Sequence, residues 1–201
     1  MISASCATNL MCTRCEKVHD LDAVHNLCAC GAPLSVRYDL QEAGRRMQRQ
    51  DLPTRRHDVW RYEEVLPVQD NRFRVCLGEG GTPLLELPRL RERLGCGRLL
   101  LKDESLNPTN SFKARGMALA VARAWELGIS ELATPSAGNA GCALAAYASR
   151  AGLRSQVFMP SDTPRAFIEE CVALGATVEM VDGLIDECGR LVAEGRETFG
   201  W

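Results

Sequence analysis

Short apolar segments alternate with longer helical segments through the second half of the chain, and this alternation limits the possible folds more than any other feature. "GRLLLKDE" (97–104) predicts a buried strand, and apolar residues at helical spacing then predict a helix over 113–127, stopped by Gly128. The remaining segments predict strands and helices in turn: strands 131–135, 154–160 and 176–181, and helices 139–152, 163–175 and 184–199. Such a pattern predicts parallel βαβ units in an α/β fold, with ligands beyond the carboxyl ends of the strands.

Residues at helix starts sharpen these boundaries. Thr163 is predicted to be an N-cap, with Pro164 at the first helical position and Gly175 after the end. Residues 41–75 are rich in arginine and interrupted by two prolines, which predicts a connecting segment with a short helix or two. We therefore divide the chain into a module at 1–40 and a larger domain at 41–201.

The composition excludes several classes of partner. The formal net charge is -2, from 26 acidic and 24 basic residues, so nucleic acid and anionic membranes are not expected partners. No apolar run is long enough to span a bilayer, and the start of the chain lacks the features of a signal peptide. The ten cysteines are therefore expected to be reduced, and we expect a cytoplasmic location.

Four cysteines near the N-terminus have the spacing of a metal site. "CTRC" and "CAC" are two pairs of cysteines separated by twelve residues, a good match for a site where four thiolates surround Zn²⁺ as a tetrahedron. The four ligands would be Cys12, Cys15, Cys28 and Cys30. Four cysteines leave no open position, so the expected zinc is structural. An empty or degenerate site is the alternative, and His19 and His25 are either substitute ligands or solvated loop residues.

The stretch "NPTNSFKARG" contains one of only three lysines in the chain, the others being Lys17 and Lys102. Asn110 tolerates left-handed backbone geometry, Ser111 is predicted to cap a helix, and Lys113 falls in the first turn. A surface lysine would normally avoid this place, because the positive end of the helix dipole disfavours a cation. An amine forms an imine with an aldehyde and a guanidinium does not, so a chemical role is one interpretation and a simple capped helix start is the other.

A second loop has a similar design. In "PSAGNAG", three residues lie where a predicted strand enters a helix: Ser136, Gly138 and Asn139. Backbone N–H groups at such a helix start are free to hold an anion. This loop again has a simple interpretation, a helix start without a ligand.

The two loops together resemble a known family. "LKDESLNPTNSFKARG" followed by "PSAGNAGCALAAYASRAGL" resembles the fold type II pyridoxal-phosphate (PLP) enzymes, whose fold is like that of the tryptophan synthase β subunit. "GEGGTPL" and the zinc-ribbon-like start at 28–40 are most similar to the threonine synthases. The resemblance implies that Lys113 carries PLP as an imine, Phe112 backs the cofactor and Asn139 bonds its 3′-oxygen. It also implies that a backbone segment receives the substrate carboxylate: Ser136, Ala137, Gly138, Asn139 and Ala140.

The implied reaction converts O-phospho-L-homoserine and water to L-threonine and phosphate, which is the work of a carbon–oxygen lyase acting on phosphates. The partner would be an amino-acid substrate, and a homo-oligomer stays open. Arg115 is either a phosphate ligand or, as is commoner for such an arginine, a salt-bridge partner.

The chain departs from the family at two points. Asn110 stands where the family has a glycine, and the chain ends before the glycine-rich loop that cradles the PLP phosphate, so we expect about the first half of an enzyme with apolar surface exposed. Two alternatives stay open: a threonine or serine dehydratase-like PLP enzyme, and a non-catalytic zinc-binding remnant.

Overall fold

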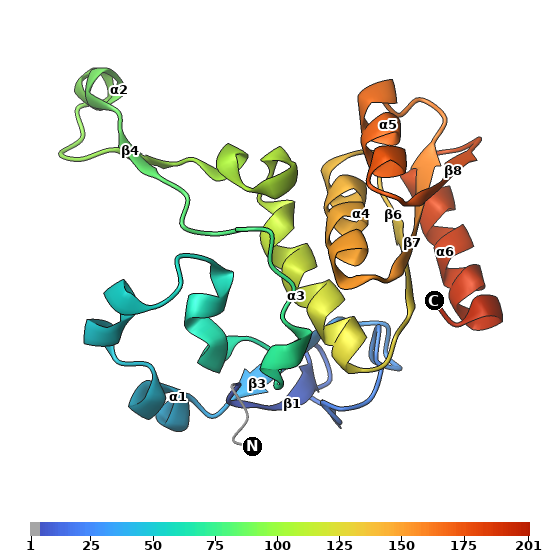
Figure 1. Ribbon diagram of the computed structural model, residues 1–201, viewed down its shortest axis with the longest axis horizontal. Helices are drawn as coiled ribbons and strands as arrows, with labels where there is room; N and C mark the ends of the chain where they lie inside the picture. Colours follow the sequence, from blue (N-terminus) through green and yellow to red (C-terminus); the bar gives the residue numbers. More distant parts are fainter. Residues whose placement is uncertain (1–4) are drawn as a thin grey trace.

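The computed structural model describes residues 5–201, so the first four residues of the predicted 1–40 module lie outside the described part. Figure 1 shows a small N-terminal sheet, an arm that projects to one side, and a group of helices around a parallel sheet. In the described residues, no helix is long and apolar enough to cross a membrane.

The N-terminal sheet is antiparallel, with β1 (Ala7–Cys12) between β2 (Val18–His19) and β3 (Leu34–Tyr38). Cys12 ends the central strand, and the "CAC" pair precedes β3, so the sheet brings the two cysteine pairs to one end. The sequence predicted these two pairs but not the strands that carry them.

The arginine-rich segment is more than a connection. It contains α1 (Leu40–Arg46), which the Asp39 side chain caps, and three 3₁₀ helices at Arg49–Thr54, Val59–Val65 and Asn71–Phe73. Trp60, Val68 and Val75 are buried in the same cluster as α3 (Lys113–Glu126). This segment therefore supplies part of the main core.

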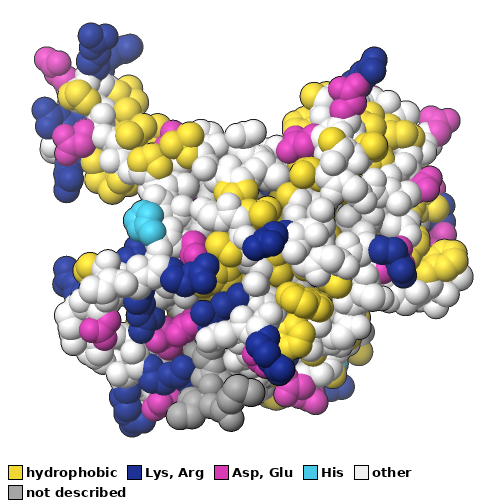
Figure 2. All heavy atoms as spheres, in the orientation of Figure 1, with side chains coloured by type: hydrophobic (Ala, Val, Ile, Leu, Met, Phe, Trp, Pro, Cys, Tyr) yellow, Lys and Arg dark blue, Asp and Glu magenta, His cyan; other side chains and the backbone are white. Residues whose placement is uncertain are grey.

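The arm consists of β4 (Leu84–Glu86), α2 (Pro88–Leu94) and β5 (Leu100–Lys102). Its two strands pair antiparallel with each other and belong to no larger sheet. The strand predicted within 97–104 is present as β5, but its predicted burial is wrong, because no further strand among the described residues pairs with it and Leu101 is 46% exposed. Apolar side chains gather on the arm in Figure 2, which confirms the expectation of exposed apolar surface.

The C-terminal part confirms the predicted α/β alternation. Three parallel strands pair in the order β6 (Glu131–Pro135), β7 (Arg154–Pro160) and β8 (Thr177–Val181). Three helices follow them in the chain, namely α4 (Asn139–Ala151), α5 (Arg165–Ala173) and α6 (Ile185–Phe199). Each predicted element of this part is present within two residues of its predicted bounds.

Two predicted helix caps are wrong. The backbone of Pro164 is extended (φ -56°, ψ 131°), so α5 begins at Arg165 and the Thr163 hydroxyl is buried without a hydrogen-bond partner. The Ser111 hydroxyl is likewise buried without a partner at the start of α3, although the Ser111 carbonyl accepts from the Ala114 N–H.

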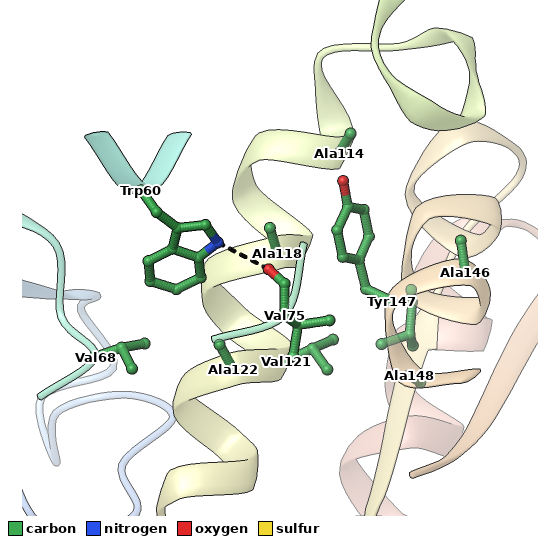
Figure 3. Close-up of a cluster of buried hydrophobic side chains, with 11 residues drawn as sticks. Trp60, Val68, Val75, Ala114, Ala118, Val121, Ala122, Ala146, Tyr147 and Ala148 are labelled. Carbon is green, nitrogen blue, oxygen red and sulfur yellow. Dashed lines mark hydrogen bonds between the residues drawn. The ribbon is translucent and has the colours of Figure 1, made fainter. Parts of the chain in front are cut away.

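The main core lies between α3, α4 and the segment before the arm. Figure 3 shows small side chains of α3 facing Tyr147 of α4, and the Trp60 Nε1–H donates to the Val75 carbonyl at 2.9 Å. Alanines such as Ala118 and Ala122 let the two helices approach closely. Residue numbers rise in the same direction on both helices, so their N-termini lie at the same end.

Candidate functional site

The loop before α3 is held in an uncommon backbone conformation. Two short 3₁₀ turns, η4 (Glu104–Leu106) and η5 (Pro108–Asn110), lead into it. Thr109 (φ 56°) and Asn110 (φ 52°) are both left-handed, and the Asn110 N–H donates to the Asn107 carbonyl at 2.9 Å. This confirms the predicted left-handed geometry of Asn110. Glycine adopts a positive φ without strain, and asparagine is among the residues that tolerate it.

Lys113 is the first residue of α3, and its side chain is free. Its amine lies 4.8 Å from the centre of the exposed Phe112 ring and has neither a hydrogen bond nor a carboxylate partner among residues 5–201. By contrast, the Lys102 amine donates to the Thr82 carbonyl. A free amine at a helix start, with the unpaired Ser111 hydroxyl two residues before it, is available for chemistry.

The loop before α4 is braced by one serine. The Ser136 Oγ accepts from the N–H groups of Gly138 (3.2 Å) and Gly141 (2.9 Å), and the Ser136 N–H donates to the Phe158 carbonyl. Of the five residues predicted to receive a carboxylate, Ser136 and Gly138 therefore have their N–H groups engaged. In the described part of the chain, the N–H groups of Ala137, Asn139 and Ala140 have no acceptor, and the Asn139 side chain is exposed and unpaired.

The two loops meet at one end of the molecule. Helices α3 and α4 pack side by side, and η5 contacts α4. Because both helices begin at this end, Lys113 at the start of α3 and Asn139 at the start of α4 lie at the same end of the molecule. The surface is hollowed there, between the arm and the α4–α5 side of the molecule (Figure 2). The positive ends of two helix dipoles thus converge near a free amine, an arrangement suited to an anionic ligand.

Arg115 anchors the base of the lysine loop. Its guanidinium bonds both carboxylate oxygens of Glu104, at 2.6 and 2.8 Å, which confirms the salt-bridge interpretation. Arg115 and the Thr82 hydroxyl hold the pKa of Glu104 at about 2, below its ordinary 4.5. The Asn107 amide donates to the same carboxylate at 3.0 Å, so the ion pair fixes both ends of the loop.

Glu79, for which no role was predicted, is fully buried and accepts a hydrogen bond from the Tyr147 hydroxyl. The signal was an acidic residue within "GEGGTPL", a turn that would normally be exposed. Its burial depends on a partner 68 residues further along the chain, and no local pattern predicts that.

The N-terminal cysteines form a compact thiol cluster. The four Sγ atoms lie within 4.8 Å of one another, with Cys12–Cys30 at 3.4 Å and Cys15–Cys28 at 3.6 Å. The backbone N–H groups of Cys15 and Arg14 donate to the Cys12 Sγ and lower its pKa to about 6. The rings of His19 and His25 lie edge to face outside this cluster.

Known proteins match the chain on both sequence and structure. The family described as pyridoxal-phosphate dependent enzyme matches residues 75–201. The chain is 38% identical over 184 residues to a threonine synthase of Methanocaldococcus jannaschii, covering 91% of this chain and 45% of that protein. It is 41% identical over 152 residues to a threonine synthase of Mycobacterium leprae, covering 73% of this chain and 42% of that protein. The chain thus spans about half the length of the curated relatives it matches.

Solved structures agree on the fold. Apo diaminopropionate ammonia lyase from Escherichia coli aligns with a TM-score of 0.58 and 26% identity, over 63% of this chain and 40% of that one. The processed form of threonine deaminase isoform 2 from Solanum lycopersicum aligns with a TM-score of 0.55 and 28% identity, over 59% of this chain and 33% of that one.

Proposed function

Because the chain belongs to the pyridoxal-phosphate dependent enzyme family, we propose that it supplies the lysine-bearing part of a threonine synthase, which converts O-phospho-L-homoserine and water to L-threonine and phosphate. The observation that carries the proposal is the free amine of Lys113, a residue that begins α3 at the same end of the molecule as the N-terminus of α4. The similarity to threonine synthases selects this reaction among those of the family.

The residues present fit the cofactor. The unpaired Lys113 amine suits its aldehyde, the unpaired Asn139 amide suits its 3′-oxygen, and the Phe112 ring lies beside the amine. These three residues would hold the cofactor. When bound, PLP would supply an electron sink for negative charge at the substrate Cα.

The remaining work falls to the chain's own groups. The free N–H groups of Ala137, Asn139 and Ala140 would bind and orient the substrate carboxylate at the positive end of α4. Lys113 would move protons among Cα, Cβ and Cγ, since its amine is unpaired and exposed. These proton transfers by Lys113 would accompany loss of phosphate from Cγ and addition of water at Cβ.

The test is covalent capture of PLP by the 201-residue chain, fixed with borohydride and mapped by peptide mass. We expect label at position 113 in the wild type, none at this position in Lys113→Arg, and unchanged label at Lys113 in Lys102→Arg, which alters a lysine whose amine bonds the Thr82 carbonyl. Phosphate release from O-phospho-L-homoserine is then assayed. Label at Lys113 with deamination of threonine and without phosphate release would favour a dehydratase-like enzyme, and absence of label at Lys113 would refute the proposal.

We also propose that the cysteine cluster holds a structural Zn²⁺. Four thiols within 4.8 Å of one another fit tetrahedral thiolate ligation, and the lowered pKa of Cys12 favours the thiolate that binds metal. We expect one zinc per chain by elemental analysis, loss of zinc in Cys12→Ser, and retention in Cys96→Ser, an exposed cysteine outside the cluster. Equal zinc content in the two variants would refute this site.

A further inference from the structure

A carboxylate lies completely buried between α4 and the turn that contacts the lysine loop. Glu79 is 0% exposed, and its Oε2 accepts from the Tyr147 hydroxyl at 2.7 Å and from the Leu77 N–H at 2.9 Å. Its Oε1 has no hydrogen-bond partner among the described residues. Within residues 5–201, no cationic side chain forms a salt bridge with this carboxylate, and acidic residues are almost never fully buried unless paired. Such a costly arrangement calls for a specific reason.

The backbone around Glu79 is fixed as firmly as its side chain. The Glu79 carbonyl accepts from the Val59 N–H at 2.8 Å. Gly80 has φ +101°, and a Cβ there would lie 2.9 Å from the Val59 nitrogen. Only glycine therefore fits at position 80, and the backbone of the turn is held against Val59.

The turn connects directly to the lysine loop. The Gly80 N–H donates to the Asn107 Oδ1 at 3.0 Å, and the buried Asn107 carbonyl accepts from the Asn110 N–H at 2.9 Å. Lys113 follows three residues later. A continuous path of hydrogen bonds and one turn thus runs from Tyr147 on α4, through Glu79, to the loop that carries the lysine.

We propose that Glu79 is a positioning residue that holds the lysine loop (107–113) in register with α4, so that Lys113 and Asn139 face one site. The inference rests on the proposed function for its chemical consequence, though the structural link itself does not depend on it. Among the described residues, Glu79 makes no hydrogen bond to Lys113 or Asn139. It acts through the Gly80 N–H and Asn107 on one side and through Tyr147 on the other.

The test compares Glu79→Gln and Tyr147→Phe with the control Glu64→Gln in the full 201-residue chain. Glu64 is another buried glutamate, paired with Arg55 at 2.7 Å, and the described residues show no hydrogen bond from it to the lysine loop. The glutamine keeps the shape of Glu79 but loses the stronger charge-assisted bonds, and the phenylalanine removes only the Tyr147 donor. Both changes are mild enough to leave the fold available for measurement.

Two readouts are taken from each variant. The first is amide hydrogen exchange of residues 107–113, measured against the rest of the chain without cofactor. The second is the rate at which PLP labels Lys113, divided by the rate at which it labels Lys17 in the same sample. Global instability affects both lysines, so it does not lower this ratio by itself.

We expect amide exchange of residues 107–113 to be about tenfold faster in both variants. We expect the labelling ratio to fall by about 10- to 100-fold, because a displacement of about 1 Å at a reacting group lowers the reaction rate by up to about 100-fold. The double variant should be no worse than the worse single variant, since both remove the same link.

Exchange and labelling ratios equal to those of Glu64→Gln would overturn the inference, as would faster exchange spread evenly over the chain. If the wild type captures no PLP, the proposed function fails, and the local exchange comparison alone supports or overturns the role of Glu79.

Discussion

Gly141 lies in the first turn of α4, and the structure leaves no room for a methyl group on it. A Cβ there would lie 2.7 Å from the Val157 Cγ1 and 3.3 Å from both the Met159 Cε and the Ser136 Cβ. The first distance is shorter than real Cβ contacts, and the atom it meets is on a stiff, fully buried valine of β7. Alanine at this position must therefore push α4 away from the sheet.

The expected loss follows from two opposing effects. Overpacking a tight core costs about 1–3 kcal/mol, while alanine gains about 0.5–1 kcal/mol over glycine in a helix. We expect Gly141→Ala to be destabilised by about 0.5–2 kcal/mol, which lowers Tm by about 1–8 °C for a chain of this size. Because the Gly141 N–H donates to the Ser136 Oγ, the same shift should loosen the 136–140 loop and reduce PLP capture.

Gly189 offers a matched control within α6, since a Cβ there would meet nothing within 4 Å. Gly189→Ala should raise the free energy of unfolding by about 0.5–1 kcal/mol through helix propensity alone. Urea unfolding of both variants measures the difference. If Gly141→Ala is stabilised as much as Gly189→Ala, the close packing of α4 on β7 is refuted.

Two further predictions concern the ion pair and the core. The pKa of Glu104 is lowered to about 2, so its pair with Arg115 contributes fully above about pH 4.5 and is lost as the pH falls towards 2. Glu104→Gln should therefore lower the free energy of unfolding by about 1 kcal/mol at neutral pH, after allowance for solvent screening. The difference from wild type should vanish in acid. A difference in urea unfolding that stays constant over this pH range would contradict the assignment. Trp60→Phe should cost about 1–3 kcal/mol because it leaves the buried Val75 carbonyl without its donor. Trp125→Phe should cost less, because the Trp125 ring is half-buried and its indole N–H has no hydrogen-bond acceptor in the described part of the chain. Equal losses in the two tryptophan variants would argue against the bond.

Much of the C-terminal architecture was predictable because its signals are local. Glycines at 128, 152 and 175 all have positive φ and lie just after helices, so the helix ends could be placed from residue type alone. The presence of Lys113 and Asn139 at helix starts also followed from the sequence, as did the four cysteines. Residue type did not predict which side chains form hydrogen bonds at the helix caps. The predictions for Ser111 and Thr163 were wrong for this reason.

The sequence alone determined where strands and helices alternate and which reactive side chains stand at their ends, because periodicity and backbone preference act over a few residues. Only the tertiary structure decided that β5 pairs in an exposed arm, that Arg115 is committed to Glu104, and that Glu79 is buried against Tyr147. Each of these outcomes depends on a partner that lies more than ten residues away in the chain. Burial and pairing energies arise from such contacts, and they exist only once the chain has folded.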